Sequence, residues 1–252
     1  MKGENGNGAL KGKVALVTGG TQGIGRAIAL ALAHRGAAVA ITYRTKKEHA
    51  ESLAERVREL GAECLLVQGD VSNKEDAQHV VETVLAAWKR LDVLVNNAGI
   101  TRDKSVRKVA GDEWADEVNV NLNGTYYCTS AALPAMMAQK FGRIINIRWY
   151  MGHSILGQAN YVSRTAGIMD FTKSLALEMA KYNITANAIA PGFTRTEMWA
   201  KIPENVLEQI RVKIPLQRFA SPEDVAKAAA FLAADGDYIT GQQLNVTGGL
   251  YV

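Results

Sequence analysis

A glycine-rich segment near the start of the chain has the residues that phosphate binding requires. It reads Thr18-Gly19-Gly20-Thr21-Gln22-Gly23-Ile24-Gly25 and lies between a short apolar run and a stretch with helical periodicity. Glycine lets the backbone turn tightly and approach a pyrophosphate, and N–H groups at the start of the next helix face the phosphates. Glycine turns without a ligand are common, but the position between strand and helix favours a dinucleotide site. The expected contacts are Gly19, Thr21, Gln22, Gly23, Ile24 and Gly25.

Apolar, β-branched runs of strand length alternate with amphipathic segments along the whole chain. The predicted strands are Val14–Val17, Ala38–Tyr43, Cys64–Gln68, Val93–Asn96, Ile144–Ile147, Thr185–Ala190 and Gln243–Val246. Helices are predicted between the first three strands, over Gly25–Arg35 and Lys47–Leu60. This alternation predicts an α/β fold, a doubly wound Rossmann-type parallel seven-stranded sheet with helices on both faces. Ligands of such sheets bind at the carboxyl ends of the strands.

Residues with capping chemistry mark several predicted helix ends. Gly36 and Gly61 follow the first two helices, where a left-handed residue is favoured. Ser72, with Glu75 three residues later, predicts a capping box at the start of a third helix. Ser221, followed by proline and then by an aspartate three residues on, predicts the start of another.

Length and composition limit the class of protein. The chain has 252 residues, of which 48% are hydrophobic and 21% charged, and this excludes both a disordered chain and a disulfide-stapled miniprotein. Because no linker or repeat interrupts the pattern, residues 11–252 are predicted to form one domain and residues 1–10 a flexible tail. The sequence shows no signal peptide or membrane span, and Cys64 and Cys128 lack metal-site spacing, so a cytoplasmic location is expected.

The formal net charge of +4 is spread along the chain, with no run of five basic residues. This pattern favours a phosphorylated small molecule over nucleic acid as the partner. The histidines outside the catalytic region, His34, His49 and His79, lack ligand spacing, so no metal site is expected.

Further motifs appear downstream in a fixed order. Asp70-Val71 follows the third predicted strand, Asn96-Asn97-Ala98-Gly99 the fourth, Asn121 lies in Val118–Leu122, and Pro191-Gly192 precedes Thr196. With the GxxxGxG turn, these motifs resemble the short-chain dehydrogenase/reductase family over almost the whole chain. The resemblance implies cofactor contacts by Asp70, Val71, Asn97, Ala98, Gly99, Pro191, Gly192 and Thr196, and a structural and catalytic role for Asn121.

Within that family, the segments GQANY, IPLQRF and YITGQQLNVTGG are most similar to bacterial 3-oxoacyl-(acyl-carrier-protein) reductases and the related acetoacetyl-CoA reductases. The resemblance implies a nicotinamide cofactor and a ketone substrate. It also implies a homotetramer, built from the long helices around Tyr161–Tyr182 and near Glu117–Met137 together with the last strands.

The end of the second predicted strand indicates which nicotinamide cofactor binds. NAD-dependent relatives usually place a carboxylate there to hydrogen-bond the ribose 2′-hydroxyl. Here the segment reads Thr42-Tyr43-Arg44-Thr45-Lys46, and Arg44 can pair with a 2′-phosphate. Gln22 occupies the turn position at which many NADP-dependent relatives have a basic residue. We therefore expect NADP rather than NAD.

Two catalytic positions of the family are altered. The resemblance implies that Tyr161 is the proton donor, with a lysine four residues later and a serine about thirteen residues earlier. The chain has Thr165 at the lysine position. Counting back from Tyr161 gives Arg148 at the serine position, and counting forward from the strand end gives Trp149. Since general acid–base assistance contributes roughly 10²–10⁴-fold, we expect weak or absent family activity.

Large side chains surround these altered positions. Trp149, Tyr150, His153 and Ser154 are predicted to fill the substrate pocket. A nucleophilic role for Ser154 beside His153 is the less favoured alternative, because adjacent side chains seldom point toward each other. Two functions stay open: an impaired NADP-dependent oxidoreductase acting on a 3-oxoacyl thioester or a smaller ketone, and a dinucleotide-binding scaffold that has lost this chemistry or has been remodelled for another ligand.

Overall fold

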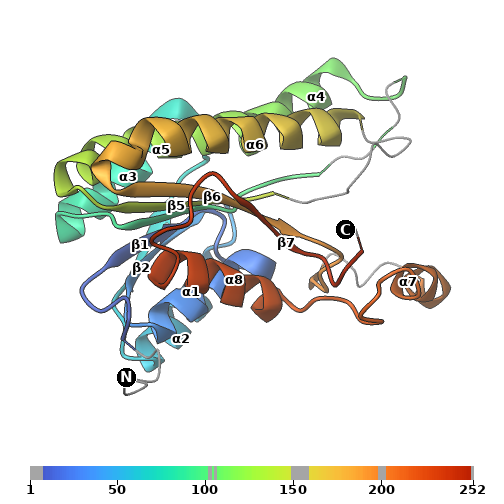
Figure 1. Cartoon of the computed structure of the whole chain (residues 1–252), viewed down its shortest axis with the longest axis horizontal. Helices are drawn as coiled ribbons and strands as arrows, with labels where there is room; N and C mark the ends of the chain where they lie inside the picture. Colours follow the sequence, from blue (N-terminus) through green and yellow to red (C-terminus); the bar gives the residue numbers. More distant parts are fainter. Residues whose placement is uncertain (1–7, 102–103, 105–106, 149–158, 198–202, 251–252) are drawn as a thin grey trace.

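Seven short strands pair side by side, all in parallel, in a single sheet (Figure 1). A computed structural model describes residues 8–101, 104, 107–148, 159–197 and 203–250, with the backbone alone for residues 159–166. The sheet order is β3-β2-β1-β4-β5-β6-β7. The strands are β1 Val14–Val17, β2 Ala38–Tyr43, β3 Cys64–Gln68, β4 Val93–Asn96, β5 Gly142–Ile147, β6 Ile184–Pro191 and β7 Gln243–Val246.

The predicted fold class is confirmed, and five strands have the predicted bounds. The other two are longer, because β5 begins at Gly142 and β6 runs from Ile184 to Pro191. The chain fills the sheet outward from β1 to β3 and then crosses to β4 on the other side of β1. The crevice between β1 and β4 is therefore a topological switch point, where open α/β sheets bind ligands.

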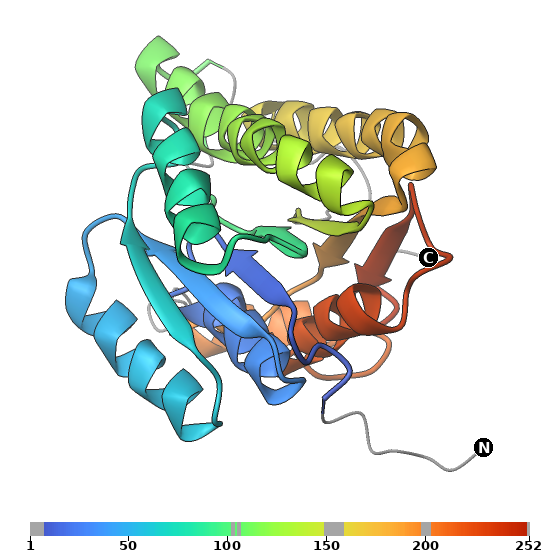
Figure 2. The ribbon, with the colours of Figure 1, turned by 90° about the vertical axis from the view of Figure 1, so that its left-hand side faces the viewer.

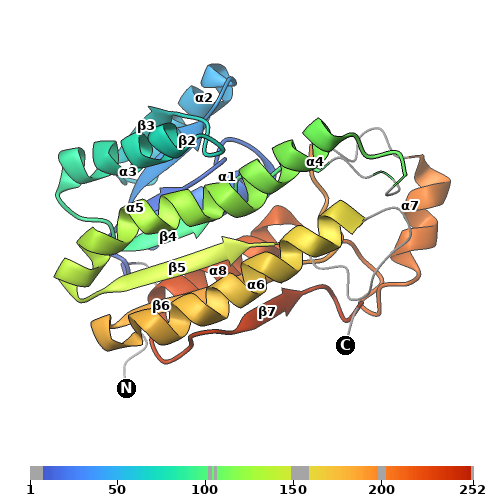
Figure 3. The same cartoon turned by 90° about the horizontal axis from the view of Figure 1, so that it is seen from above.

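Helices cover both faces of the sheet (Figure 2). They are α1 Gly23–His34, α2 Lys47–Glu59, α3 Lys74–Trp88, α4 Gly111–Val118, the π-helical segment η1 Asn119–Asn123, α5 Gly124–Gln139, α6 Ala159–Met179, the 3₁₀ segment η2 Ala180–Tyr182, α7 Glu204–Arg211 and α8 Pro222–Ala234. Helices α1, α2 and α8 lie on one face, and α3, α5 and α6 on the other (Figures 1 and 3). Along β1, Ala15 and Val17 pack into the first layer, whereas Val14 and Leu16 pack into the second.

Most predicted caps are confirmed. Gly36 and Gly61 have positive φ angles of 93° and 79° directly after the first two helices. At α8, the Ser221 side chain accepts a hydrogen bond from the amide of Asp224, whose carboxylate accepts one from the amide of Ser221. This reciprocal pair closes the N-terminal end of the helix.

The predicted start of α3 is wrong by one residue. Asn73 is the N-cap, and its Oδ1 accepts a hydrogen bond of 2.9 Å from the amide of Asp76. The Ser72 hydroxyl instead donates to Asp70 Oδ1 at 2.7 Å. The Ser72 hydroxyl is thereby oriented toward Asp70, and the Asn73 side chain accepts the amide hydrogen bond at the start of the helix in its place.

The predicted tail does not extend as far as Leu10. This side chain is only 2% exposed and packs into the core beside α1. Its amide donates a hydrogen bond of 2.9 Å to the carbonyl oxygen of Arg35, just beyond the C-terminal end of α1. The ordered domain therefore includes at least this residue of the segment predicted to be flexible.

A buried carboxylate ties together the amino ends of β1 and β4. Asp92 is 0% exposed and accepts hydrogen bonds from Arg90 Nε and Nη2, both at 2.7 Å, and from the amide of Val14 at 2.9 Å. Lys13 Nζ lies 3.3 Å from the same carboxylate. Burial raises the pKa of Asp92, but these hydrogen bonds and the cationic charges outweigh burial and lower it.

Within the part of the chain that the structure describes, no helix has both the length and the apolar character needed to cross a membrane.

Candidate functional site

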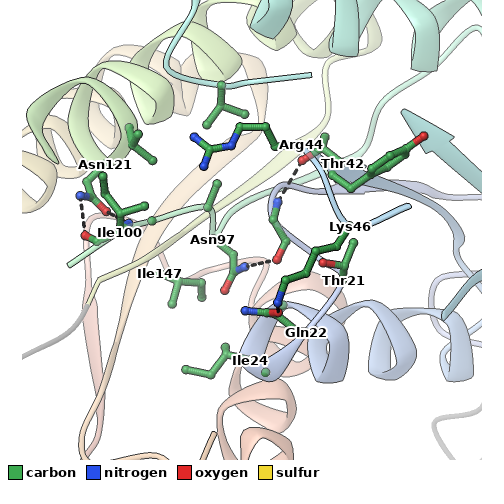
Figure 4. A pocket seen from close by; sticks show the side chains of 18 of the residues that line it. Thr21, Gln22, Ile24, Thr42, Arg44, Lys46, Asn97, Ile100, Asn121 and Ile147 are labelled. Carbon is green, nitrogen blue, oxygen red and sulfur yellow. Dashed lines mark hydrogen bonds between the residues drawn. The ribbon is translucent and has the colours of Figure 1, made fainter. Parts of the chain in front are cut away.

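A cavity of about 390 Å³ lies at the carboxyl ends of β1, β2 and β4, at the switch point of the sheet. It brings together residues from seven predicted segments that are far apart in the sequence. The predicted site residues among those that line it are Gly19, Thr21, Gln22, Gly23, Ile24, Gly25, Arg44, Asp70, Val71, Asn97, Ala98, Gly99, Asn121, Arg148 and Thr196. Figure 4 shows several of them around the cavity.

The glycine turn is packed too closely to accept side chains. Gly19 has a φ of +60°, and a Cβ atom there would lie 2.9 Å from the Cα of Ala98. A Cβ on Gly25 would lie 2.6 Å from the carbonyl oxygen of Gly19. These glycines are therefore needed for the turn to pass close to β4 and to the start of α1. The turn leaves backbone N–H groups at the N-terminal end of α1 beside the cavity, where an anionic group is stabilised.

A hydroxyl and an amide hold this turn against the end of β4. Thr18 Oγ1 accepts hydrogen bonds of 3.0 Å from the amides of both Asn97 and Ala98. The Asn97 side chain donates back to the carbonyl oxygens of Thr18 and Gly19, each at 3.0 Å (Figure 4). On the other side, the amide of Gly19 donates to Thr42 Oγ1 on β2 at 2.9 Å. The shape of the glycine turn is thus fixed by side chains from two neighbouring strands.

The end of β2 brings a cation to the cavity and places it near an acid. Arg44 Nη1 lies 3.2 Å from Asp70 Oδ2, and the side chains are 63% and 31% exposed. Asp70 Oδ1 also accepts hydrogen bonds from the amide and hydroxyl of Ser72. Partial burial raises the pKa of Asp70, but the Ser72 hydrogen bonds and the Arg44 interactions outweigh it and lower the pKa. Asp70 is therefore a carboxylate at neutral pH, positioned to accept hydrogen bonds from a ligand.

Asn121 lies on η1, where the helix between α4 and α5 widens into a π-helical turn. Its Oδ1 accepts a hydrogen bond of 3.2 Å from the amide of Ile100, and its Nδ2 donates to the carbonyl oxygens of Ile100 at 3.0 Å and Glu117 at 2.8 Å (Figure 4). The side chain thereby fixes the segment that follows β4. A Cβ on Gly99 would lie 2.6 Å from Asn121 Oδ1, so the small residue is required beside it. π-helical turns occur frequently at functional sites.

Arg148 lines the cavity but also reaches across the sheet. Its amide donates to the carbonyl oxygen of Ile189 at 2.9 Å, so the residue continues the pairing of β5 with β6. Its Nη1 donates to Gln243 Oε1 on β7 at 2.8 Å. Arg148 therefore belongs both to the sheet and to the lining of the cavity.

For several predicted site residues the structure describes no side chain. Trp149, Tyr150, His153 and Ser154 lie outside the described residues. Tyr161 and Thr165 belong to the first turns of α6, where the structure describes the backbone alone.

Pro191 and Gly192 are buried at the end of β6 and are not among the residues that line the cavity. The amide of Gly192 donates to the carbonyl oxygen of Val246 at 2.9 Å, so this segment is paired with β7. Thr196, four residues later, does line the cavity.

Some residues that line the cavity were not predicted by the sequence analysis. They are Thr42, Tyr43, Thr45, Lys46, Gly69, Ile100, Thr101, Val120, Ile147, Ile168 and Glu197. Most of them directly flank predicted residues in the turns that follow β2, β3 and β4. Extending each motif by a residue or two would have found these.

Among the described residues, no group of three or more His, Cys, Asp or Glu side chains is arranged to hold a metal ion. The polar groups that surround the cavity are instead backbone amides, neutral amide side chains, hydroxyls, three cations and two carboxylates. This donor set fits a phosphorylated nucleotide, since backbone amides at a helix N-terminus and nearby cations both stabilise an anionic group.

Comparisons with known proteins agree with this geometry. The family described as Enoyl-(Acyl carrier protein) reductase matches residues 19–251. The 3-oxoacyl-(acyl-carrier-protein) reductase FabG of Staphylococcus aureus is 43% identical over 242 residues, which cover 95% of this chain and 98% of that protein. The 3-oxoacyl-(acyl-carrier-protein) reductase of Synechocystis is 42% identical over 247 residues, covering 96% and 98%. A crystal structure from Sinorhizobium meliloti, described as a short-chain alcohol dehydrogenase, matches with a TM-score of 0.91 at 35% identity, covering 96% and 97%.

Proposed function

The chain belongs to the short-chain dehydrogenase/reductase family of oxidoreductases, and from this premise we propose that it is an NADP-dependent reductase of a 3-oxoacyl thioester or a related ketone, with impaired activity. The observation that carries the proposal is the single cavity in which the glycine turn, Arg44, Asp70, Asn97 and Asn121 meet. The curated relatives with 42–43% identity over nearly their whole length carry names that specify a 3-oxoacyl substrate.

The preference for NADP rests on the end of β2. Arg44 borders the cavity with a side chain that is 63% exposed, and no acidic residue occurs between positions 42 and 46. A guanidinium attracts a 2′-phosphate, whereas the 2′-hydroxyl of NAD is usually bound by a carboxylate. We expect the purified protein to bind NADPH at least about tenfold more tightly than NADH in a fluorescence titration. Equal affinity, or tighter NADH binding, would contradict this assignment.

The reduction itself requires a hydride at the carbonyl carbon and a proton at the carbonyl oxygen. The reduced nicotinamide supplies the hydride when it is bound. In the proposal, Tyr161 donates the proton, which leaves a hydroxyl group on the product. Asn121 supports the site by holding the segment after β4 in place.

Impaired activity follows from the altered positions. Thr165 carries no cation to lower the pKa of Tyr161, and Arg148 and Trp149 carry no hydroxyl to orient the carbonyl. The loss of such assistance lowers the rate roughly 10²–10⁴-fold. Two double variants restore both groups, Thr165→Lys with Arg148→Ser and Thr165→Lys with Trp149→Ser, and the double variant referred to below is the more active of the two. We expect it to raise NADPH-dependent reduction of a 3-oxoacyl thioester by at least about tenfold, while NADPH affinity changes little.

A second candidate function is a dinucleotide-binding scaffold without this chemistry, either a natural pseudoenzyme or a remodelled pocket. Bulky or polar residues at Trp149, Tyr150, His153 and Ser154 favour it. Robust ketone reduction by the unmodified protein would exclude the scaffold, and activity that appears only in the double variant would support it. Failure to bind either nicotinamide nucleotide would contradict both functions.

The assembly and surroundings of the protein are part of the same proposal. We infer a homotetramer with a small-molecule substrate, no nucleic-acid or membrane partner and no bound metal, in the cytoplasm. Light scattering coupled to size-exclusion chromatography tests the assembly, since a tetramer has four times the mass of the chain and a monomeric peak would contradict it.

A further inference from the structure

We propose that Lys46, held at the cavity by Gln22, is a second cation that recognises the 2′-phosphate of NADP. The inference rests on the proposed function, because it concerns the same nucleotide. Lys46 Nζ donates a hydrogen bond of 2.8 Å to Gln22 Oε1, and both residues line the cavity. Figure 4 shows the Lys46 side chain extending to Gln22.

The contact joins two turns that are 24 residues apart in the sequence. Gln22 is the residue immediately before α1, at the centre of the glycine turn, and Lys46 is the residue immediately before α2. The parallel pairing of β1 with β2 brings these turns together at the carboxyl edge of the sheet. Lys46 thereby brings a positive charge to the glycine turn, where the sequence itself has a neutral Gln22.

The charge of Lys46 differs from that of Arg44 in how far it is compensated. Arg44 lies 3.2 Å from the Asp70 carboxylate, so part of its attraction for an anion is offset. Among the described residues, the hydrogen-bond partner of Lys46 is a neutral amide oxygen, which orients the ammonium group without cancelling its charge. An oriented cation of this kind favours a dianionic phosphate over a neutral hydroxyl.

The next residue provides a natural control. Lys47 carries the same charge, but it lies in the first turn of α2, where its Nζ is 3.5 Å from Glu51 Oε1 four residues later. It is not among the residues that line the cavity. Removal of either lysine changes the net charge equally, so a difference between the two variants reports the position of Lys46 and not the overall charge.

The alternative is that the contact only fastens the two turns together. A fastening role affects NADP and NAD alike, because both share the adenosine and diphosphate. A phosphate-recognising role affects NADP alone and depends on the positive charge, so the two roles predict different ratios of affinity.

The test is calorimetric titration of NADP⁺ and NAD⁺ into the full chain and into four variants: Lys46→Gln, Lys46→Arg, Lys47→Gln and Gln22→Ala. We expect Lys46→Gln to weaken NADP⁺ binding about tenfold and NAD⁺ binding by less than about twofold. Lys46→Arg should retain most of the NADP⁺ affinity, and Lys47→Gln should match the unmodified chain. Gln22→Ala should lower the ratio of NADP⁺ to NAD⁺ affinity by a smaller factor, because it releases the lysine without removing its charge.

The outcomes separate this inference from the proposed function. If the unmodified chain binds neither nucleotide, or prefers NAD⁺, the proposed cofactor is wrong. If it prefers NADP⁺ and Lys46→Gln leaves that preference unchanged, the proposed cofactor stands and the role of Lys46 is refuted. An equal loss of both affinities would assign the contact to fastening alone and would also refute the inference.

Discussion

Replacing Thr18 with valine tests whether the hydroxyl of this residue holds the glycine turn. The Thr18 side chain is 2% exposed, and its Oγ1 accepts hydrogen bonds of 3.0 Å from two consecutive amides, those of Asn97 and Ala98. Valine has nearly the same shape but cannot accept a hydrogen bond. The substitution therefore leaves two N–H groups without this acceptor at a site where water has little access.

The expected size of the effect follows from this count. Each buried amide without an acceptor costs roughly 1–3 kcal/mol, so two of them lower the free energy of unfolding by roughly 2–4 kcal/mol if the turn relaxes in part. For a chain of this length, such a loss lowers the melting temperature by roughly 5–15 °C. Thr18→Ser is the matched control, since it keeps the oxygen and loses one methyl group, which costs about 1 kcal/mol.

Urea unfolding and NADPH titration test this prediction. Urea unfolding should give the order of stability as unmodified chain, then Thr18→Ser, then Thr18→Val, and the serine variant should keep more of the NADPH affinity. The affinity should fall in the valine variant because the turn that presents the amides is no longer held to β4. If Thr18→Val is as stable as Thr18→Ser and binds NADPH equally well, the hydroxyl does not hold the turn.

Further predictions concern an acid, a glycine and the two thiols. Because the pKa of buried Asp92 is lowered, its stabilising effect is present above about pH 4 and is lost as pH falls through the folded pKa. Asp92→Asn should cost roughly 1–3 kcal/mol at neutral pH, since the Arg90 and Lys13 side chains that lose their partner reach solvent. It should also flatten the acid limb of stability against pH in thermal unfolding, and an unchanged limb would contradict this. Gly99→Ala places a methyl 2.6 Å from Asn121 Oδ1, so the urea midpoint should fall by an equivalent of roughly 1–3 kcal/mol, and an unchanged midpoint would show that the segment yields freely. Burial raises the pKa of Cys64 to about 11 and that of Cys128 to about 12. Both should therefore react with iodoacetamide at pH 8 more than about tenfold more slowly in the folded chain than in urea, and equal rates for Cys64 would refute its burial.

Strands and helices could be predicted from the sequence where a local pattern of apolar or capping residues determines them. The apolar runs predicted the existence of all seven strands and the bounds of five, because a parallel strand covered on both faces is mostly hydrophobic. The start of α3 was missed by one residue because Ser72 and Asn73 are both good N-cap residues, and the hydrogen bond that orients Ser72 toward Asp70 is not encoded in a propensity rule. Leu10 was missed because a single apolar residue among glycines carries no periodic signal, although the core has a place for it.

The candidate site likewise contains some residues that could be predicted from the sequence and some contacts that could not. Residues at strand ends, such as Asn97 and Arg44, were predictable because parallel strands end at one edge of the sheet. The contact of Arg148 with Gln243 could not be predicted. It requires β7 to lie next to β6, and it requires the Arg148 side chain to extend across β6 to reach β7. The contact of Lys46 with Gln22 likewise depends on the spacing of two turns, which no local pattern encodes.

The burial of Leu10 determines where the N-terminal segment can be tagged or shortened without destabilising the core. Its amide is bonded beside the C-terminal end of α1, whereas the nucleotide cavity lies at the N-terminal end of that helix. A purification tag or a surface tether attached ahead of Gly8 is therefore separated from the cavity by the whole length of α1. Proteolytic trimming that removes Leu10 would instead open a hole in the hydrophobic core, so the safe limit for shortening the chain lies before this residue.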